Sequence, residues 1–216
     1  MLDALAGAFA EVADDASVRV VVLGGHGKAF CAGADVNELA ALNPQTAREF
    51  IGRVHRACDA VRKLPVPVVA RLHGAVIGAG LELAAACDLR VAAKGTRFAM
   101  PEVRLGIPSV VEAALLPRLV GSGRAAWLVL TGEPIDAKRA YDWGLVDALA
   151  ENAALDQTVS SVVNSLLAGD RSALAMQKEL LQLWEEQPLS VSIGASLEHF
   201  ARAYAQARPN ELMRRK

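Results

Sequence analysis

The stretch Gly78-Ala79-Gly80-Leu81-Glu82 lies near the middle of the chain, after an apolar run over residues 66–72 and before a helical pattern over residues 81–87. This order predicts a strand, a tight turn and a helix. A helix that begins on Gly and Ala presents unpaired backbone N–H groups, which together with the helix dipole attract a negative oxygen. Because Glu82 lies one turn inside that helix, the stretch favours acid–base chemistry on a carbonyl compound. Taken alone, it is more typical of a buried strand-to-helix connection in which Glu82 complements the dipole.

Length and composition restrict the class of protein around this stretch. The chain has 216 residues, of which 53% are hydrophobic, so it can bury the core of one ordinary domain with a helical appendage. Only 5% are aromatic and the net charge is −1, which argues against a nucleic-acid partner. The three cysteines, Cys31, Cys58 and Cys87, are odd in number and widely spaced, as in a reducing compartment. Neither an apolar run of about 18 residues nor a signal peptide is seen, so we expect a cytoplasmic protein without a membrane partner.

Strands alternate with helices early in the chain, and helices dominate late. Upstream of the central stretch we expect a helix over 1–13, a buried parallel strand over 18–23, a small-residue loop over 24–35 and a helix over 44–64. Downstream we expect strands over 88–93 and 97–99, a proline-punctuated loop over 100–108, helices over 109–120, 123–131 and 136–143, a short strand over 145–146, and helices over 153–168, 171–186 and 190–207. The pattern predicts an α/β core over residues 1–150 followed by a helical region over residues 151–216.

Three segments, taken in order, resemble the fingerprints of the enoyl-CoA hydratase/isomerase, or crotonase, superfamily. They are Gly27-Lys28-Ala29-Phe30-Cys31-Ala32-Gly33-Ala34-Asp35, Gly78-Ala79-Gly80-Leu81-Glu82-Leu83 with Cys87-Asp88, and Phe98-Ala99-Met100-Pro101-Glu102-Val103-Arg104-Leu105-Gly106-Ile107-Pro108. Each motif alone is weak, whereas their order and spacing are specific. The resemblance runs over nearly the whole chain.

The resemblance implies a crotonase-like spiral of ββα units with a C-terminal helical region that builds homotrimers or dimers of trimers. Relatives carry further strands before the helix expected over 1–13, and we expect these N-terminal strands to be missing here. The strand over 18–23 would then lose a neighbour and become an exposed edge.

The resemblance also implies a coenzyme A thioester as substrate, an acyl-CoA, with no separate cofactor. The thioester oxygen would accept hydrogen bonds from the backbone N–H groups of Ala34 and Ala79, which form an oxyanion hole. The strip over 34–37 would line the bound pantetheine and thioester. The substrate-binding residues implied in this way are Ala32, Ala34, Asp35, Val36, Asn37, Gly78 and Gly80.

Two glutamates, Glu82 and Glu102, match the pair that hydratases of the family place across a water molecule. Water would attack the β-carbon of a 2-enoyl thioester while negative charge builds on the thioester oxygen. We assign Glu82 to orienting and activating the water, and Glu102 to exchanging protons with the water and the α-carbon. A metal site is not expected, because the four histidines do not cluster in the sequence.

The segment Ser109-Val110-Val111-Glu112 departs from the family, which commonly has a Gly-rich helix start there. Val110 and Val111 are expected to narrow the acyl pocket, and Glu112 adds a third acid. Three functions are open: a 2-enoyl-CoA hydratase, another crotonase activity such as isomerisation or decarboxylation, and a non-catalytic acyl-CoA-binding or assembly subunit. The presence of both acids favours hydration, since isomerases can work with one carboxylate.

Overall fold

The computed structural model describes residues 1–205 and 208–214 of the chain. Its strands in chain order are β1 (Val21–Gly24), β2 (Val68–Leu72), β3 (Ala75–Ile77), β4 (Leu89–Ala93), β5 (Arg97–Ala99), β6 (Ile135–Asp136) and β7 (Ala148–Ala150). Its α-helices are α1 (Leu2–Asp14), α2 (Val36–Ala40), α3 (Pro44–Lys63), α4 (Ala79–Ala86), α5 (Leu116–Val120), α6 (Ser122–Thr131), α7 (Ala137–Asp142), α8 (Leu155–Leu167), α9 (Arg171–Glu186), α10 (Leu189–Tyr204) and α11 (Arg208–Met213). Three 3₁₀ helices, η1 (Glu102–Leu105), η2 (Val111–Leu115) and η3 (Asn152–Ala154), complete the set.

The strands form two sheets, and β2 of the larger sheet leads through residues 73–74 into β3 of the smaller one. The larger sheet has the order β1-β2-β4-β7 and is parallel throughout. The smaller sheet has the order β3-β5-β6, in which β3 is parallel to β5 and β6 is antiparallel to it. From β2 to β5 the chain alternates between the two sheets, and β3 leads directly into the turn at Gly78. Within the described residues β1 is an edge strand, as expected.

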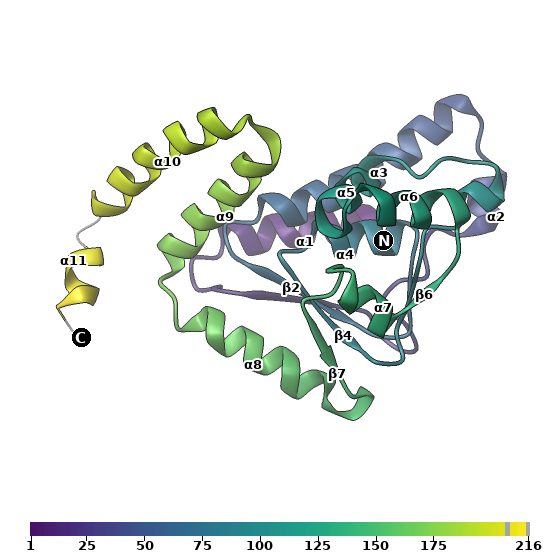
Figure 1. Ribbon diagram of the computed structural model, residues 1–216. Coiled ribbons are helices and arrows are strands. Elements are labelled where there is room, and N and C mark those ends of the chain that lie inside the picture. Colours follow the sequence, from purple (N-terminus) through teal and green to yellow (C-terminus); the bar gives the residue numbers. More distant parts are fainter. Residues whose placement is uncertain (206–207, 215–216) are drawn as a thin grey trace.

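Helices cover both faces of the larger sheet, because β2 is apolar on both sides. Val68, Ala70 and Leu72 belong to the main core, with side chains of α3 and α4. Val69 instead packs in a second cluster with Leu155 and other residues of α8. Figure 1 shows α3 and α4 on one side of the sheet and α8 on the other. The helix α4 is thus enclosed between the sheet, α3 and η2, which buries the residues of its first turns.

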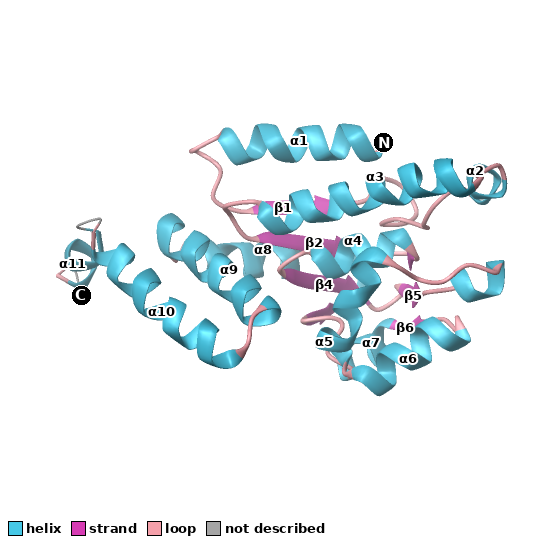
Figure 2. Cartoon of the chain, turned by 90° about the horizontal axis from the view of Figure 1, so that it is seen from above, coloured by secondary structure: helices cyan, strands magenta, loops and turns pink. Residues whose placement is uncertain are grey.

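A buried lysine attaches the C-terminal helices to this core. Lys178 of α9 is only 5% exposed, and its ammonium group donates to the carbonyls of Val61 and Val66 and to Asp88 Oδ2, at 3.1, 3.2 and 2.7 Å. Asp88 Oδ2 also accepts the N–H of Val68, at 2.7 Å. Beyond this anchor, α10 and α11 extend past the end of the sheet in both views (Figures 1 and 2).

The expected α/β architecture is confirmed, and most element boundaries agree within a few residues. The helix expected over 109–120 is wrong in its first half: residues 109–110 are irregular, 3₁₀ helix η2 follows, and α5 begins only at Leu116. The strand expected over 145–146 lies instead at β7, three residues later. The short elements α2, β3 and β6 were not expected. The last two residues of the helix expected over 190–207 lie outside the described residues.

Candidate active site

The central turn places a free backbone donor at the start of α4. Gly78 has φ +53° and ψ −123°, a conformation that side chains rarely adopt, and its N–H donates to the carbonyl of Ala99 at 2.9 Å. Ala79 is the first residue of the helix, so its N–H has no partner within the helix. The first residue of α4 therefore offers a backbone N–H that the helix itself does not use, and its role as an oxyanion donor stays a prediction.

The loop before α2 is held against this turn by backbone contacts. Cys31 forms a bridge to β3: its N–H donates to the carbonyl of Ala75, and its carbonyl accepts the N–H of Ile77, at 3.1 and 3.0 Å. A Cβ added to Gly80 would lie 2.3 Å from the carbonyl oxygen of Cys31, so only glycine allows the two backbones to approach. This close approach brings the segment that contains Ala34 to the start of α4.

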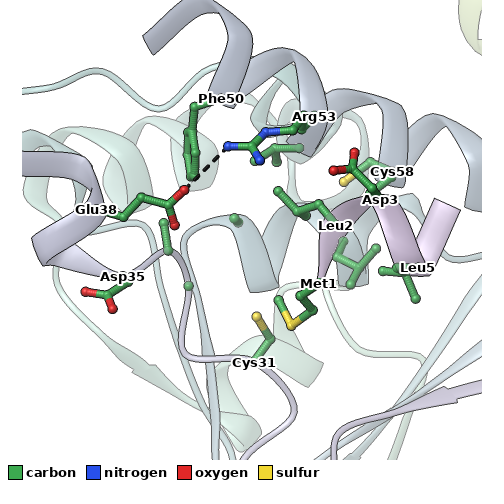
Figure 3. A pocket seen from close by; sticks show the side chains of 16 residues that line it. Met1, Leu2, Asp3, Leu5, Cys31, Asp35, Glu38, Phe50, Arg53 and Cys58 are labelled. Atoms are coloured by element: carbon green, nitrogen blue, oxygen red, sulfur yellow. Dashed lines mark hydrogen bonds and ion pairs between the residues drawn. The ribbon is translucent and has the colours of Figure 1, made fainter. Parts of the chain in front are cut away.

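A cavity of about 330 Å³ opens at this junction. Ala34, Asp35 and Ala79 line it, as the resemblance implies. Much of the rest of its wall comes from the first residues of the chain and from α3, with Leu2, Leu5 and Phe50 around the space (Figure 3). An ion pair between Arg53 and Glu38, 3.4 Å long, joins α3 to α2 beside it. The cavity is therefore mainly apolar; Ala34 and Ala79 are among its lining residues, whereas Glu82 and Glu102 are not.

The remaining predicted binding residues lie around this cavity without lining it. Val36 and Asn37 form the first turn of α2, where the N–H of Asn37 donates to Asp35 Oδ1 at 2.8 Å. Asp35 is therefore the N-cap of a short helix, a role that the sequence analysis missed. Ala32, Gly78 and Gly80 shape the two backbone segments that meet there. The bulky Val110 and Val111 do not line the cavity either.

The two predicted acids approach the turn from different elements. Glu82 lies in the first turns of α4, is only 4% exposed, and accepts the N–H of Ala113 at 3.3 Å. Glu102 begins η1 and accepts the hydroxyl of Ser109 at 2.8 Å. A Cβ on Gly78 would lie 2.4 Å from Glu102 Oε1, so the Glu102 carboxylate lies against the turn that begins α4. The sequence analysis did not identify Ser109 or the N–H of Ala113.

The environment of Glu82 changes its proton affinity. Burial, and then the charge of Glu102, raise the pKa of Glu82 from its ordinary 4.5 to about 8. The charge of Glu112 raises the pKa further, whereas the N–H of Ala113 lowers it. Glu82 is therefore mainly protonated at neutral pH.

A third acid and a histidine adjoin this pair. Glu112 is 6% exposed, and its Oε1 lies 2.7 Å from Nδ1 of His55 on α3. The sequence analysis did not single out His55, because the four histidines do not cluster in the sequence. In the structure His55 contacts Glu112, 57 positions away in the sequence, and so joins the acid cluster formed by Glu82, Glu102 and Glu112.

The geometry agrees with the comparisons to known proteins. A family model described as enoyl-CoA hydratase/isomerase matches residues 1–213. The chain belongs to the enoyl-CoA hydratase/isomerase family. A crystal structure of enoyl-CoA hydratase from Mycobacterium smegmatis superposes with a TM-score of 0.92 at 35% identity, covering 95% of this chain and 80% of that one. The crotonase fold implied by the sequence is thereby confirmed.

Individual relatives within the family carry hydratase and isomerase names. The short-chain-enoyl-CoA hydratase of Clostridium acetobutylicum is 32% identical over 90% of this chain and 76% of its own length. The enoyl-CoA isomerase/hydratase fer4 of Mycosarcoma maydis is 33% identical over 86% of this chain. A Bacillus subtilis protein named "Probable enoyl-CoA hydratase" is 37% identical over 71% of it. The matches span 65% and 60% of the fer4 and Bacillus subtilis sequences, respectively.

Within residues 1–205 and 208–214, no group of three or more His, Cys, Asp or Glu side chains is arranged to hold a metal ion. No helix of that part is long and apolar enough to cross a membrane.

Proposed function

We propose that the protein hydrates a 2-enoyl-CoA thioester to the 3-hydroxyacyl-CoA. The observation that carries this proposal is the position of Glu82 and Glu102 at one turn, next to the unpaired N–H of Ala79. Hydration needs a proton acceptor for water and a proton donor for the α-carbon, and two acids beside an oxyanion site can supply both. The names of the hydratase relatives support the same reaction.

The roles of the two acids follow from their surroundings. The N–H groups of Ala34 and Ala79 stabilise the negative charge that forms on the thioester oxygen. Protonated Glu82 orients the water by a hydrogen bond, so the proton of the attacking water passes to Glu102. The hydroxyl oxygen bonds to the β-carbon, and Glu102 then returns a proton to the α-carbon. The sequence analysis assigned Glu82 both to orienting and to activating the water. The present proposal keeps only the orienting role.

We further propose that the protein acts as a homotrimer or dimer of trimers in the cytoplasm. The helix α10 supports association, because it exposes large apolar side chains that a second copy would cover. These side chains are Leu189, Val191, Ile193, Leu197 and Phe200. Sedimentation velocity of the purified protein would test the assembly, and a monomer at micromolar concentration would contradict it.

The decisive experiment is a spectrophotometric assay with crotonyl-CoA. A hydratase removes the conjugated double bond, so the enoyl absorbance falls and 3-hydroxybutyryl-CoA accumulates. Conversion of a 3-enoyl-CoA to the 2-enoyl product, without hydration, would instead indicate the isomerase activity included in the name of the Mycosarcoma maydis relative. Binding without turnover of either thioester would support a non-catalytic acyl-CoA-binding subunit.

A further inference from the structure

The segment over 109–113 contacts both proposed catalytic acids. The hydroxyl of Ser109 donates to Glu102, and the N–H of Ala113 donates to Glu82. Between them, Val111 has φ +42°, a left-handed conformation that is costly for a β-branched residue. Such strain persists only where the surrounding structure holds it, and it often occurs at functional sites. The strained turn directs the next residue, Glu112, inward.

Glu112 has one oxygen with a partner and one without. Its Oε1 contacts His55 Nδ1 at 2.7 Å, within the range of charge-assisted hydrogen bonds. Its Oε2 is buried and has no hydrogen-bond partner among the described residues. Leaving a buried carboxylate oxygen unpaired is costly. The Glu112 side chain itself is 7% exposed, whereas the His55 side chain is 53% exposed, so the pair extends from the surface to the acid cluster.

We propose that Glu112, held by His55, is a positioning residue that keeps Glu82 in its protonated form. A negative charge near a second carboxyl group disfavours ionisation of that group. The elements packed around Glu82 bring few other titratable groups: Glu102 from η1, Glu112 from η2, and His55 and Cys58 from α3, with Cys87 at the end of α4. Of these, Glu102 belongs to the reaction itself, which leaves Glu112 as the additional anion.

The buried thiol of Cys58 lies near Glu112 and Glu82. Burial raises the pKa of Cys58 well above its usual range, and the charges of Glu112 and Glu82 raise it further. Burial also raises the pKa of Cys87, to about 12, so both thiols stay neutral and add no charge. The pKa of Glu82 is therefore raised chiefly by burial and by the charge of Glu102, is lowered by the N–H of Ala113, and is raised by a smaller amount by the charge of Glu112.

The test compares Glu112→Gln with the unmodified protein by NMR titration of ¹³C-labelled glutamate carboxyl carbons, without substrate. The Glu82 resonance is assigned by its loss in Glu82→Gln. We expect the Glu82 midpoint near pH 8 in the unmodified protein and about half a pH unit lower in Glu112→Gln, since the charge of Glu112 is the smallest of the causes that act on the pKa of Glu82. Glu49→Gln, which removes an exposed acid of the same helix as His55, should leave the midpoint unchanged. An unchanged midpoint in Glu112→Gln overturns the proposal.

A kinetic readout links this result to the proposed function, on which it rests. If protonated Glu82 is the working form, the alkaline limb of the kcat profile should move to lower pH in Glu112→Gln by the same amount. Should the amide variant fold poorly, Glu112→Met replaces it, since the unpaired oxygen makes an apolar side chain of similar length tolerable. Absence of hydratase turnover in the unmodified protein would refute the proposed function, whereas the NMR midpoints would still decide the role of Glu112.

Discussion

Glu82 and Glu102 lie at the same turn but in opposite surroundings. Glu82 is buried in a regular helix and accepts a hydrogen bond from the backbone N–H of Ala113. That N–H can move only together with the whole segment over 111–115. Glu102 is half-buried on a 3₁₀ turn and is bonded by a hydroxyl that can rotate. A fixed, mainly protonated acid suits the orientation of water. A more accessible acid suits repeated proton transfer.

This difference shows why two residues of the same type can take different roles in one reaction. Two carboxyl groups close together separate their proton affinities even in identical surroundings, and unequal burial separates them further. The four predictions below test the difference from its largest expected effect to its smallest.

Replacement of each acid by its amide should affect catalysis unequally. Glu102→Gln removes the group that accepts the proton of water, and we expect kcat to fall by about 10²–10⁴-fold. Glu82→Gln should lose less, because the amide N–H₂ can still donate to the water as the protonated acid does. Steady-state kinetics on crotonyl-CoA measures both. A larger loss in Glu82→Gln would reverse the assignment, and full activity in both variants would exclude the mechanism.

The burial of Glu82 should make stability depend on pH. Its folded-state pKa, about 8, lies above the ordinary 4.5, so its stabilising contribution is complete below about pH 4.5 and is lost as pH rises through about 8. Relative to Glu82→Gln, the unmodified protein should lose a few kcal/mol of unfolding free energy across this window, since one pKa unit corresponds to about 1.4 kcal/mol. Urea denaturation at pH 5.5 and pH 8.5 measures the loss. Equal losses in both proteins would show that Glu82 does not titrate there.

Gly78→Ala should lower both activity and stability, because the substitution displaces Glu102 and strains the backbone of the turn. The new Cβ would meet Glu102 Oε1 at 2.4 Å, and the end of that side chain can move away. We expect kcat to fall by about tenfold to a hundredfold, because a displacement of about 1 Å is costly in catalysis, together with about 1–2 kcal/mol of backbone strain.

Gly121→Ala is the matched control for that strain. Gly121 also has a positive φ, +82°, but a Cβ there would contact nothing within 4 Å. The control should lose stability by urea denaturation and keep kcat. If Gly78→Ala loses no more activity than Gly121→Ala, the position of the Glu102 carboxylate against the turn does not matter for catalysis.

The sequence predicted the regular parts of this site and missed the irregular ones. The turn at Gly78 and the helix that contains Glu82 could be predicted because small residues follow an apolar run, and the order of motifs indicated the family. The start of η2 could not, because apolar spacing from residue 109 onward is compatible with a continuous helix. The left-handed conformation of Val111 depends on tertiary packing rather than on its own preference, which opposes it.

Contacts between residues far apart in the sequence could not be predicted either. His55 meets Glu112 only after α3 packs against η2, and nothing in the local sequence of either residue indicates the other. The helix α2 was missed because it has five residues, although Asp35 before it is a typical N-cap. Sequence analysis thus predicted the two acids as catalytic, whereas the groups that contact them could be found only in the three-dimensional structure.

Ser109→Ala should produce the smallest effect and should be confined to Glu102. It removes the hydroxyl that donates to Glu102 Oε2 at 2.8 Å and leaves the N–H of Ala113 on Glu82 in place. One hydrogen bond to a charged group contributes about 1.5–3 kcal/mol at most, and water can replace part of it at this half-buried position, so we expect a threefold to tenfold fall in kcat. The Glu82 midpoint in the NMR titration should stay near pH 8. A fall in that midpoint as large as the one expected for Glu112→Gln would mean that the two acids share one environment, contrary to the division of roles inferred from their burial.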